Sequence, residues 1–540
     1  MKRCDPFTPA LLMAAILAGA TWAGLAKGGL FPVRHEGDML HMIQIVLRQA
    51  AGEWPHLDFM TPLGVLAYAP IALFVRLGHP LAEAFVLGQA LVGALLAPAA
   101  WWAGVSRLPR GWAHLFGAGI MLLAVALVPA TPDPDISLSM SYNRWAWAIL
   151  FVVLTLAVFP ARWTGPRARL VDGLVVGLAL GVLALIKVTY VLAAAPVAAL
   201  AFFLARDGRS GLAALGAGGA VALAVTFAAG PGLWPAYFGD LLAVSQTEVR
   251  AYPSGSLLDV VGGTTARIGS LLYLGTVILL RRAGRDREGL LLLAAAPGLA
   301  YVTFQNYGND PVWLFFLGLA ALALRPASGE GAASSGQGLT VAGWAALLLV
   351  APIFMAMAES PLRNSAAAAS GTVEALPDAT GIRMAEDRVA HVQTRVSRAM
   401  RAGHAWWQPR LLPEAVLVAG QPLENCRLIS GLVGWFQSVA KDIDEAGLGG
   451  RPVLVADMLS AYWLYGGPAP LPGGAPWYYG GLPGVQAAEQ LLVPQCAARP
   501  DVRARVLREL DTAGYALTEL RRTPDYVLLA INPIAPDSAK

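Results

Sequence analysis

Long apolar runs separated by short polar connections dominate the first two thirds of the chain. A helix needs about 20 apolar residues to cross the hydrocarbon core of a bilayer. Runs of that kind occur near 9–30, 81–104, 112–130, 144–160, 170–186, 188–205, 211–230, 267–281, 289–305, 310–325 and 339–358. The pattern predicts an α-helical polytopic membrane protein with about eleven transmembrane helices.

One further apolar segment, 62–78, is short and flanked by Pro62 and Pro80. If it does not span, the basic connections all fall on one side, which the positive-inside rule makes cytoplasmic. These cations are Lys2, Arg3, Arg107, Arg110, Arg162, Arg167, Arg169, Arg206, Arg209, Arg281, Arg282, Arg285, Arg287 and Arg325. We therefore predict an interfacial or re-entrant helix at 62–78, a cytoplasmic N-terminus and an outer tail.

The tail from about residue 360 regains an ordinary density of charged residues. Strand-like runs at 415–418, 452–455 and 526–531 alternate with helical patterns near 381–402 and 501–514, which indicates a mixed α/β domain. The expected organisation is a transmembrane domain at 1–358, whose first outer loop (31–80) holds interfacial helices, and a periplasmic or extracellular domain at 359–540. Cys426 and Cys496 lie in this outer domain, and the sequence leaves open whether they form a disulfide.

Composition agrees with a membrane protein. The chain has 540 residues, of which 56% are hydrophobic and 14% charged, and its mean hydropathy is +0.56. Soluble domains carry about 25% charged residues. The net charge of +4 comes from arginine-rich short loops and indicates no nucleic-acid partner. Three cysteines match neither a disulfide scaffold nor a zinc-ligand spacing.

The stretch from His35 to Pro70 follows the first apolar run and places Glu36, Asp38 and Asp58 among apolar and aromatic residues. Acids close to a membrane are costly and tend to mark function. A helical pattern runs through 39–50, so one interpretation makes Asp38 the N-cap of that helix. The other makes it catalytic.

This stretch resembles the first outer loop of GT-C-type membrane glycosyltransferases, the mannosyltransferase and aminoarabinose transferase-like group. The shared features are E-G-D after the first helix and G-E-W-P-x-x-D-F-x-x-P-x-G at 52–64. The segment Gly177-Leu178-Ala179-Leu180-Gly181 followed by Ile186-Lys187-Val188-Thr189-Tyr190 is similar to a G-L-x-x-G…T-K-x-T segment of the same families. Many relatives have adjacent acids, whereas Gly37 separates Glu36 from Asp38 here.

The resemblance implies transfer of a sugar from a polyprenyl-phosphate carrier to an envelope glycan, lipid or protein acceptor at the outer membrane face. It implies Asp38 as general base with inversion at the sugar carbon, and Glu36 is the second choice. One carboxylate suffices to accept the proton of the acceptor hydroxyl. The departing phosphate is already an anion and needs cations rather than a general acid.

Candidate ligands for the donor must face outward. They are Arg144, Lys187, Asp58, Tyr142 and Arg250. Arg144 and Lys187 are the strongest, Lys187 because of the family-like segment. A cation at the end of a span is also often a snorkelling side chain that only positions the helix.

Asp133 and Asp135 follow the end of another predicted span, on the same outer face of the membrane as the candidates above. Two acids two residues apart could hold a divalent cation (Mg²⁺ or Mn²⁺) together with Asp38 or Asp58, because such ions prefer oxygen ligands. The alternative is a solvated turn, which Pro132 and Pro134 favour.

Two other classes of function compete with the enzyme. A transporter or lipid-linked flippase without transferase activity would carry ionisable residues deep within the spans, yet the acids of this chain cluster in loops. A membrane-anchored binding protein would act through its tail. The leading expectation is a multi-pass transferase of a bacterial inner membrane.

Overall fold

The computed structural model describes residues 6–247, 249, 263–305, 311–326, 332–378, 380–395, 416–424 and 426–533. The chain forms two compact units. The first, called the helical unit, comprises Met1–Leu30, Leu63–Pro231 and Tyr252–Ala367. The second, called the α/β unit, comprises Phe31–Pro62, Gly232–Ala251 and Ala368–Lys540. These limits differ from the single boundary expected after residue 358, because residues 31–62 pack with the tail.

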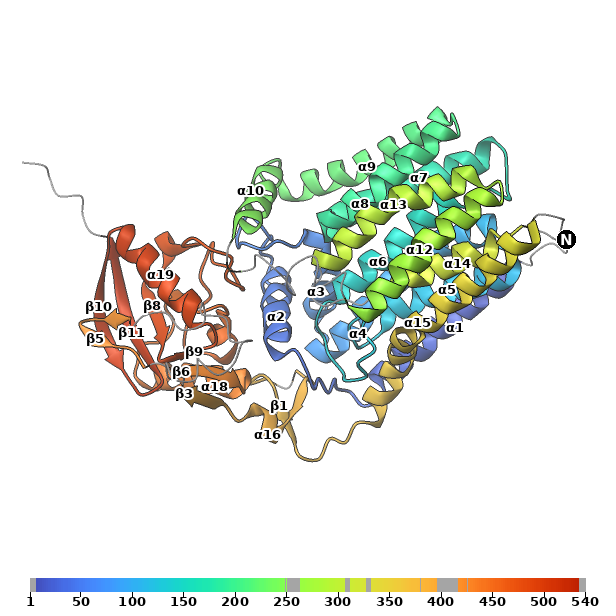
Figure 1. Ribbon diagram of the computed structural model, residues 1–540. Coiled ribbons are helices and arrows are strands. Elements are labelled where there is room, and N and C mark those ends of the chain that lie inside the picture. Colours follow the sequence, from blue (N-terminus) through green and yellow to red (C-terminus); the bar gives the residue numbers. More distant parts are fainter. Residues whose placement is uncertain are drawn as a thin grey trace, which may run out of the picture. The chain divides into compact units, whose positions relative to one another are not determined.

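The helical unit has a helix at each of the eleven predicted spans (Figure 1). They are α1 (Phe7–Leu25), α4 (Leu81–Arg107), α5 (Arg110–Val125), α6 (Ser141–Val158), α7 (Pro166–Ile186), α8 (Val188–Leu204), α9 (Gly208–Ala229), α12 (Thr264–Arg282), α13 (Asp286–Gln305), α14 (Leu314–Ala323) and α15 (Ala332–Ala366). Within the described ranges, seven helices are long and apolar enough to cross a membrane. The predicted polytopic helical class is confirmed.

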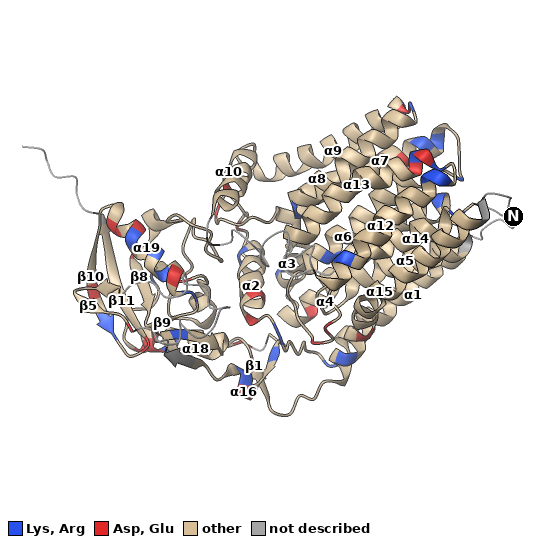
Figure 2. Cartoon of the chain, in the orientation of Figure 1, with Lys and Arg blue, Asp and Glu red and all other residues tan. Residues whose placement is uncertain are grey.

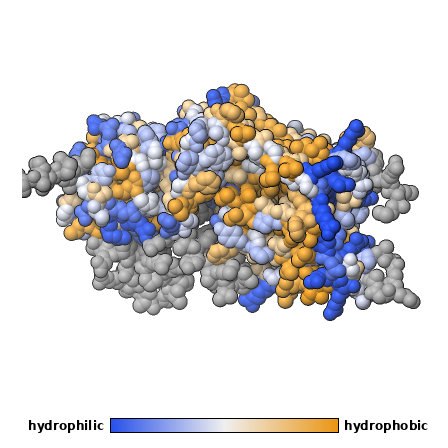
Figure 3. All heavy atoms as spheres, turned by 90° about the horizontal axis from the view of Figure 1, so that it is seen from above, coloured by the Kyte–Doolittle hydropathy of each residue, from blue (hydrophilic) through white to orange (hydrophobic). Residues whose placement is uncertain are grey.

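Helix α6 is the most buried helix of this unit and α9 is one of the most exposed. In the most apolar part of each helix, 94% of the α6 residues but only 6% of the α9 residues are buried. Trp145 and Trp147 of α6 are fully covered, whereas Leu215 and Phe227 of α9 are exposed. Figure 2 shows few charges along the helix lengths, and Figure 3 shows apolar side chains over much of the visible face of this unit. Such a surface suits contact with lipid.

Glycines allow α7 and α9 to pack closely. A Cβ atom added to Gly177 would lie 2.1 Å from the carbonyl oxygen of Ala214. Small residues permit this approach of two helix backbones within a membrane. The first glycine of the segment Gly177–Gly181 therefore has a packing role.

The ambiguous segment 62–78 forms a short 3₁₀ helix (Val65–Ala67) and the eight-residue helix α3 (Ala69–Arg76). Eight residues of α-helix rise about 12 Å, whereas the hydrocarbon core is about 30 Å thick. This segment is too short to span as a helix, in agreement with the prediction.

The α/β unit contains α2 (Glu36–Ala50), α10 (Leu233–Gln246), α18 (Leu432–Glu445) and α19 (Pro500–Thr512). Its largest sheet has the order β10-β11-β8-β7, in which only β7 and β8 pair in parallel. A second sheet has the order β3-β6-β9, and two further pairs are β1-β2 and β4-β5. The strands are β1 (Thr372–Glu374), β2 (Arg383–Ala385), β3 (Val392–Arg395), β4 (Leu417–Val418), β5 (Gln421–Pro422), β6 (Cys426–Ser430), β7 (Val453–Val455), β8 (Gln490–Pro494), β9 (Cys496–Ala497), β10 (Tyr515–Arg522) and β11 (Tyr526–Pro533).

The predicted mixed α/β character of the tail is confirmed, with one local error. The prediction of a helix near 381–402 is wrong over the described residues of that segment. They form β2, the four-residue helix α16 (Glu386–Val389) and β3. Strand pairing overrides the local preference there, because β3 pairs with β6. The core of the unit gathers Leu454, Leu491 and Val527 from adjacent strands with Val502 from α19.

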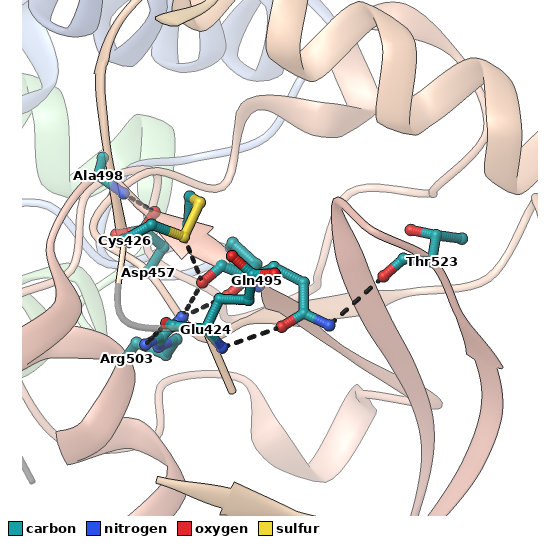
Figure 4. The surroundings of a disulfide bond; sticks show 9 residues. Glu424, Cys426, Asp457, Gln495, Ala498, Arg503 and Thr523 are labelled. Atoms are coloured by element: carbon teal, nitrogen blue, oxygen red, sulfur yellow. Dashed lines mark hydrogen bonds between the residues drawn. A yellow bond between two sulfur atoms is a disulfide. The ribbon is translucent and has the colours of Figure 1, made fainter. Parts of the chain in front are cut away.

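A disulfide joins Cys426 of β6 to Cys496 of β9, which are paired residues of neighbouring strands (Figure 4). Beside it, the buried carboxylate of Asp457 accepts hydrogen bonds from the backbone N–H groups of Ala498 (2.7 Å) and Arg499 (2.9 Å). Burial raises the pKa of Asp457 above its ordinary value despite these bonds. The disulfide and this carboxylate both secure the segment between β9 and α19.

Candidate functional site

Two sequence segments that carry the resemblance meet within the helical unit. The backbone N–H of Gly64 donates to the carbonyl oxygen of Ile186 at 3.1 Å. A Cβ atom at Gly64 would lie 2.2 Å from the carbonyl oxygen of Leu185. Glycine is therefore required where the first segment contacts the end of α7, directly before Lys187.

Lys187 lies in extended backbone between α7 and α8. Its ammonium group donates to the side-chain oxygen of Asn143 at 3.0 Å and lies 5.6 Å from the centre of the Tyr142 ring. The Tyr142 ring makes an edge contact with Tyr68, with 5.5 Å between centroids. We call Tyr68, Tyr142, Asn143 and Lys187 the Lys187 cluster, in which a half-buried cation lies beside one aromatic ring that itself contacts a second.

Two helices begin at this cluster. Tyr142 and Asn143 lie in the first turn of α6, and Lys187 immediately precedes α8. The first turns of helices present free backbone N–H groups and a partial positive charge, which favour anions. The buried hydroxyl oxygens of Ser141 and Thr189, in the same two turns, have no hydrogen-bond partner in the described part of the chain. The local electrostatics therefore suit a negatively charged group.

The side chain of Arg144 is buried inside the helical unit and does not face outward as the sequence predicts. Its side chain is 2% exposed inside the helical unit. The guanidinium donates to the carbonyl oxygen of Leu123 (2.9 Å) and to the side-chain oxygen of Gln89 (2.7 Å). These bonds tie α6 to α4 and α5, and Nε has no partner among the described atoms. Direct phosphate binding by Arg144 stays a prediction, whereas an anchoring role is visible.

The remaining candidates from the helical segments are Asp133, Asp135 and Arg250. Asp133 accepts a hydrogen bond from the backbone N–H of Asp135 at 3.0 Å, as in a turn. Within the described ranges, no three His, Cys, Asp or Glu side chains group to hold a metal ion. A divalent cation held by Asp133 and Asp135 together with Asp38 or Asp58 stays a prediction. Arg250 lies outside the described residues.

In the α/β unit, Asp38 belongs to the first turn of α2. The N-cap position is occupied by His35, so the interpretation of Asp38 as the N-cap is wrong. The side chain of Asp38 is half-buried.

Helix α2 is more buried by protein than the surface helix expected from the sequence. The Gln44 side-chain oxygen accepts from the indole N–H of Trp463 (2.9 Å) and the hydroxyl of Ser460 (3.2 Å). These bonds fix the helix that carries Asp38 within the α/β unit.

Glu36 has a visible structural contact. Its carboxylate accepts a 2.6 Å hydrogen bond from the backbone N–H of Val433, in the first turn of α18. A carboxylate at a helix N-terminus is stabilising, but burial raises the pKa of Glu36 above its ordinary value. Glu36 thus joins α2 to α18, and its catalytic role stays a prediction.

We expect Glu36→Gln to raise the stability of the α/β unit at neutral pH and to weaken its dependence on pH. A carboxyl whose pKa is raised on folding stabilises fully below its unfolded pKa, and this contribution is lost as the pH rises through the folded pKa. The glutamine oxygen can still accept from Val433 without a charge to desolvate. Protease resistance of the full chain against urea, measured from about pH 4 to pH 8, tests this. Equal destabilisation by Glu36→Gln and Glu36→Ala at neutral pH would contradict it.

Asp58 is exposed and stabilises a turn. Its carboxylate accepts from the backbone N–H of Trp54 at 2.6 Å. Next to it, Arg48 pairs with Glu53 (2.5 Å) and lies 4.6 Å from the Phe59 ring centre. These contacts account for the G-E-W-P-x-x-D-F pattern as a folded turn, and substrate binding by Asp58 stays a prediction.

No sequence pattern indicates the His–Asp pair that the α/β unit contains. Nδ1 of His56 lies 2.8 Å from a carboxylate oxygen of Asp240 on α10. The same oxygen accepts from the backbone N–H of Thr61 at 3.1 Å. The two partners are 184 residues apart, so only the folded chain brings them together.

Comparisons with known proteins give two similar solved structures. No family model and no curated protein matches the sequence. The structure of ArnT from Cupriavidus metallidurans in the apo state has a TM-score of 0.42 and 13% identity, over 96% of this chain and 97% of that chain. The structure of the same protein bound to undecaprenyl phosphate has a TM-score of 0.40 and 12% identity, with the same coverage. The chain is thus similar at low identity, along nearly its whole length, to ArnT, an aminoarabinose transferase of the GT-C type.

Proposed function

We propose that this chain is a membrane glycosyltransferase that takes a sugar from a polyprenyl-phosphate carrier at the outer face of the bilayer. One observation carries the proposal: two separate segments that resemble GT-C enzymes meet at the Lys187 cluster, through Gly64 and Ile186. The acceptor is an envelope glycan, a lipid or a protein.

In this proposal the Lys187 cluster holds the phosphate of the donor. The ammonium group of Lys187 and the first turns of α6 and α8 neutralise the charge that grows on the departing phosphate. Tyr142 and Tyr68 offer ring faces and edges to the apolar surface of the donor. Arg144 keeps α6 in place through its bonds to α4 and α5.

Asp38 acts as the general base. Its carboxylate accepts the proton of the acceptor hydroxyl while that oxygen forms a bond to the anomeric carbon. The bond between this carbon and the phosphate oxygen breaks, and its electron pair leaves with the polyprenyl phosphate. Attack opposite the leaving group inverts the anomeric configuration. No general acid is needed, because the leaving phosphate is stable as an anion.

The burial of charges favours an enzyme over a transporter. A transport pathway would place ionisable residues near the middle of the spans. Arg144 lies in the first turn of α6 and Arg107 is the last residue of α4. The partner of Arg107 is Asp172, in the second turn of α7. These buried charges lie near helix ends, as anchoring residues do.

The disulfide supports an outer location for the α/β unit. Disulfides persist in oxidising compartments such as the bacterial periplasm and are rare in the cytosol. The bond between Cys426 and Cys496 therefore favours the orientation that the basic loops of the helical unit predict. We propose an inner-membrane protein with this unit in the periplasm.

Lys187→Met is expected to weaken binding of undecaprenyl phosphate to the purified full chain roughly tenfold or more, because one charge-assisted contact to the phosphate is lost. Native mass spectrometry in detergent measures the bound fraction. Lys187→Arg should retain most of the binding, and Lys441→Met, which removes an exposed lysine of the α/β unit, should retain all of it. If undecaprenyl phosphate does not bind the unmodified protein, or binds Lys187→Met equally well, the proposal fails.

A further inference from the structure

A cavity of about 430 Å³ lies in the helical unit, at the end where the basic connections gather. It is bordered by the ends of α4, α6, α7, α8, α9 and α13 and by the connection 159–164. This end is opposite to the one that holds the Lys187 cluster, because Lys187 follows the last residue of α7, whereas Arg169 lies in its first turn. The volume falls within the range of about 300–1,000 Å³ that is usual for small-molecule sites.

The cavity is lined by three arginines and two acids, and the acids are already engaged. Asp172 pairs with Arg107 at 2.5 Å. Asp207 caps α9, where its carboxylate accepts from the backbone N–H (3.2 Å) and hydroxyl (2.8 Å) of Ser210. Arg169 and Arg287 form no ion pair with any acid in the described part of the chain. The cavity therefore presents two guanidinium groups that have no acid partner within ion-pair distance, and that of Arg287 donates to the carbonyl oxygen of Ala157 at 3.4 Å.

The rest of the wall is apolar and aromatic. Val176, Ala198 and Phe202 line the cavity beside the cations. Trp163, at the same rim, contacts the ring of Trp102 with 5.4 Å between centroids. Tryptophans concentrate at the level of lipid headgroups, where one side of the ring is wet and the other apolar. The cavity thus combines a cationic part and an apolar part beside a tryptophan, the residue type typical of membrane interfaces.

We propose that this cavity binds an anionic membrane phospholipid. Arg169 and Arg287 hold the phosphate of the headgroup, since guanidinium groups form strong paired hydrogen bonds with phosphate. The acyl chain lies against Val176, Ala198 and Phe202. Basic pockets between helices on the cytoplasmic side commonly bind anionic headgroups, and the positive-inside rule places this end there. The proposal is independent of the transferase activity.

The test uses the full chain, delipidated in detergent and analysed by native mass spectrometry. The probes are dioctanoyl phosphatidylglycerol, dioctanoyl phosphatidylcholine and inorganic phosphate. Phosphatidylglycerol is expected to bind in preference to both others. Arg169→Gln and Arg287→Gln should each lower its affinity roughly fivefold, and the double variant roughly 30-fold. Arg282→Gln removes an exposed arginine of the same end that does not line the cavity, and should bind like the unmodified chain.

Three outcomes would overturn the proposal. The first is unchanged binding of phosphatidylglycerol to the double variant. The second is equal binding of phosphatidylcholine, which would show that the negative charge is not recognised. The third is competition by inorganic phosphate at equal concentration, which would indicate a site for free phosphate rather than for lipid. The single variants keep the test decisive if the double variant does not fold.

Discussion

Asp38→Asn is expected to lower the rate of sugar transfer about 10²–10⁴-fold, the usual contribution of a general base. The amide has nearly the same shape as the carboxylate but cannot accept the proton of the acceptor hydroxyl. Asp38 belongs to α2, which is held in the α/β unit by the hydrogen bonds of Gln44 and Glu36. A neutral side chain at position 38 should therefore leave the fold unchanged.

The measurement compares membranes that contain equal amounts of each inserted protein. A panel of undecaprenyl-phosphate sugars is supplied, and transfer is followed with the donor that the unmodified chain uses. Asp511→Asn is the matched control, because it makes the same chemical change at an exposed position of α19. Full activity of Asp38→Asn would exclude Asp38 as the base. Loss of activity with Glu36→Gln and not with Asp38→Asn would transfer the role to Glu36.

Removal of the disulfide is expected to lower the free energy of unfolding of the α/β unit by about 4 kcal/mol. The bond closes a loop of 70 residues, and the restriction of such a loop in the unfolded chain is the main source of the stabilisation. Both cysteines are 2% exposed, so two serines in their place would also bury hydroxyl groups. We therefore expect Cys426→Ser with Cys496→Ser to destabilise at least as much as reduction of the bond does.

Pulse proteolysis of the full chain in increasing urea, followed by detection of cleavage after residue 368, measures this effect. The control is Cys4→Ser, which removes the cysteine that takes no part in the disulfide. Dithiothreitol should shift the cleavage midpoint of the unmodified protein and not that of the double serine variant. If reduction leaves the midpoint unchanged, the disulfide does not contribute to the stability of this unit.

The helical unit could be predicted well from sequence because its signals are local. A run of about 20 apolar residues forms a helix in a membrane whatever its neighbours are, since its backbone must satisfy its own hydrogen bonds. Short strands are different, because their stability depends on the strands beside them. That is why the local pattern near 381–402 predicts a helix, although Val392–Arg395 pairs with β6.

Part of the candidate site was also visible in the sequence. Tyr142 and Lys187 both lie at ends of predicted spans, and Lys187 also belongs to the segment that resembles the family; the structure brings the two together through the cation–ring contact. The inward position of Arg144 could not be predicted, because its acceptors belong to two other helices. A snorkelling arginine and a buried one have the same local sequence.

The sequence by itself determined the membrane class and the positions of about eleven helices, and its resemblance to a family pointed to Asp38 and Lys187 as functional candidates. Apolar length, charge bias and short motifs suffice for these conclusions, since each is read from neighbouring residues. Only the tertiary structure decided that Glu36 contacts α18, 397 residues later in the chain, and that Gly64 must be glycine beside Ile186. Such contacts depend on how distant segments pack, and no local pattern records them.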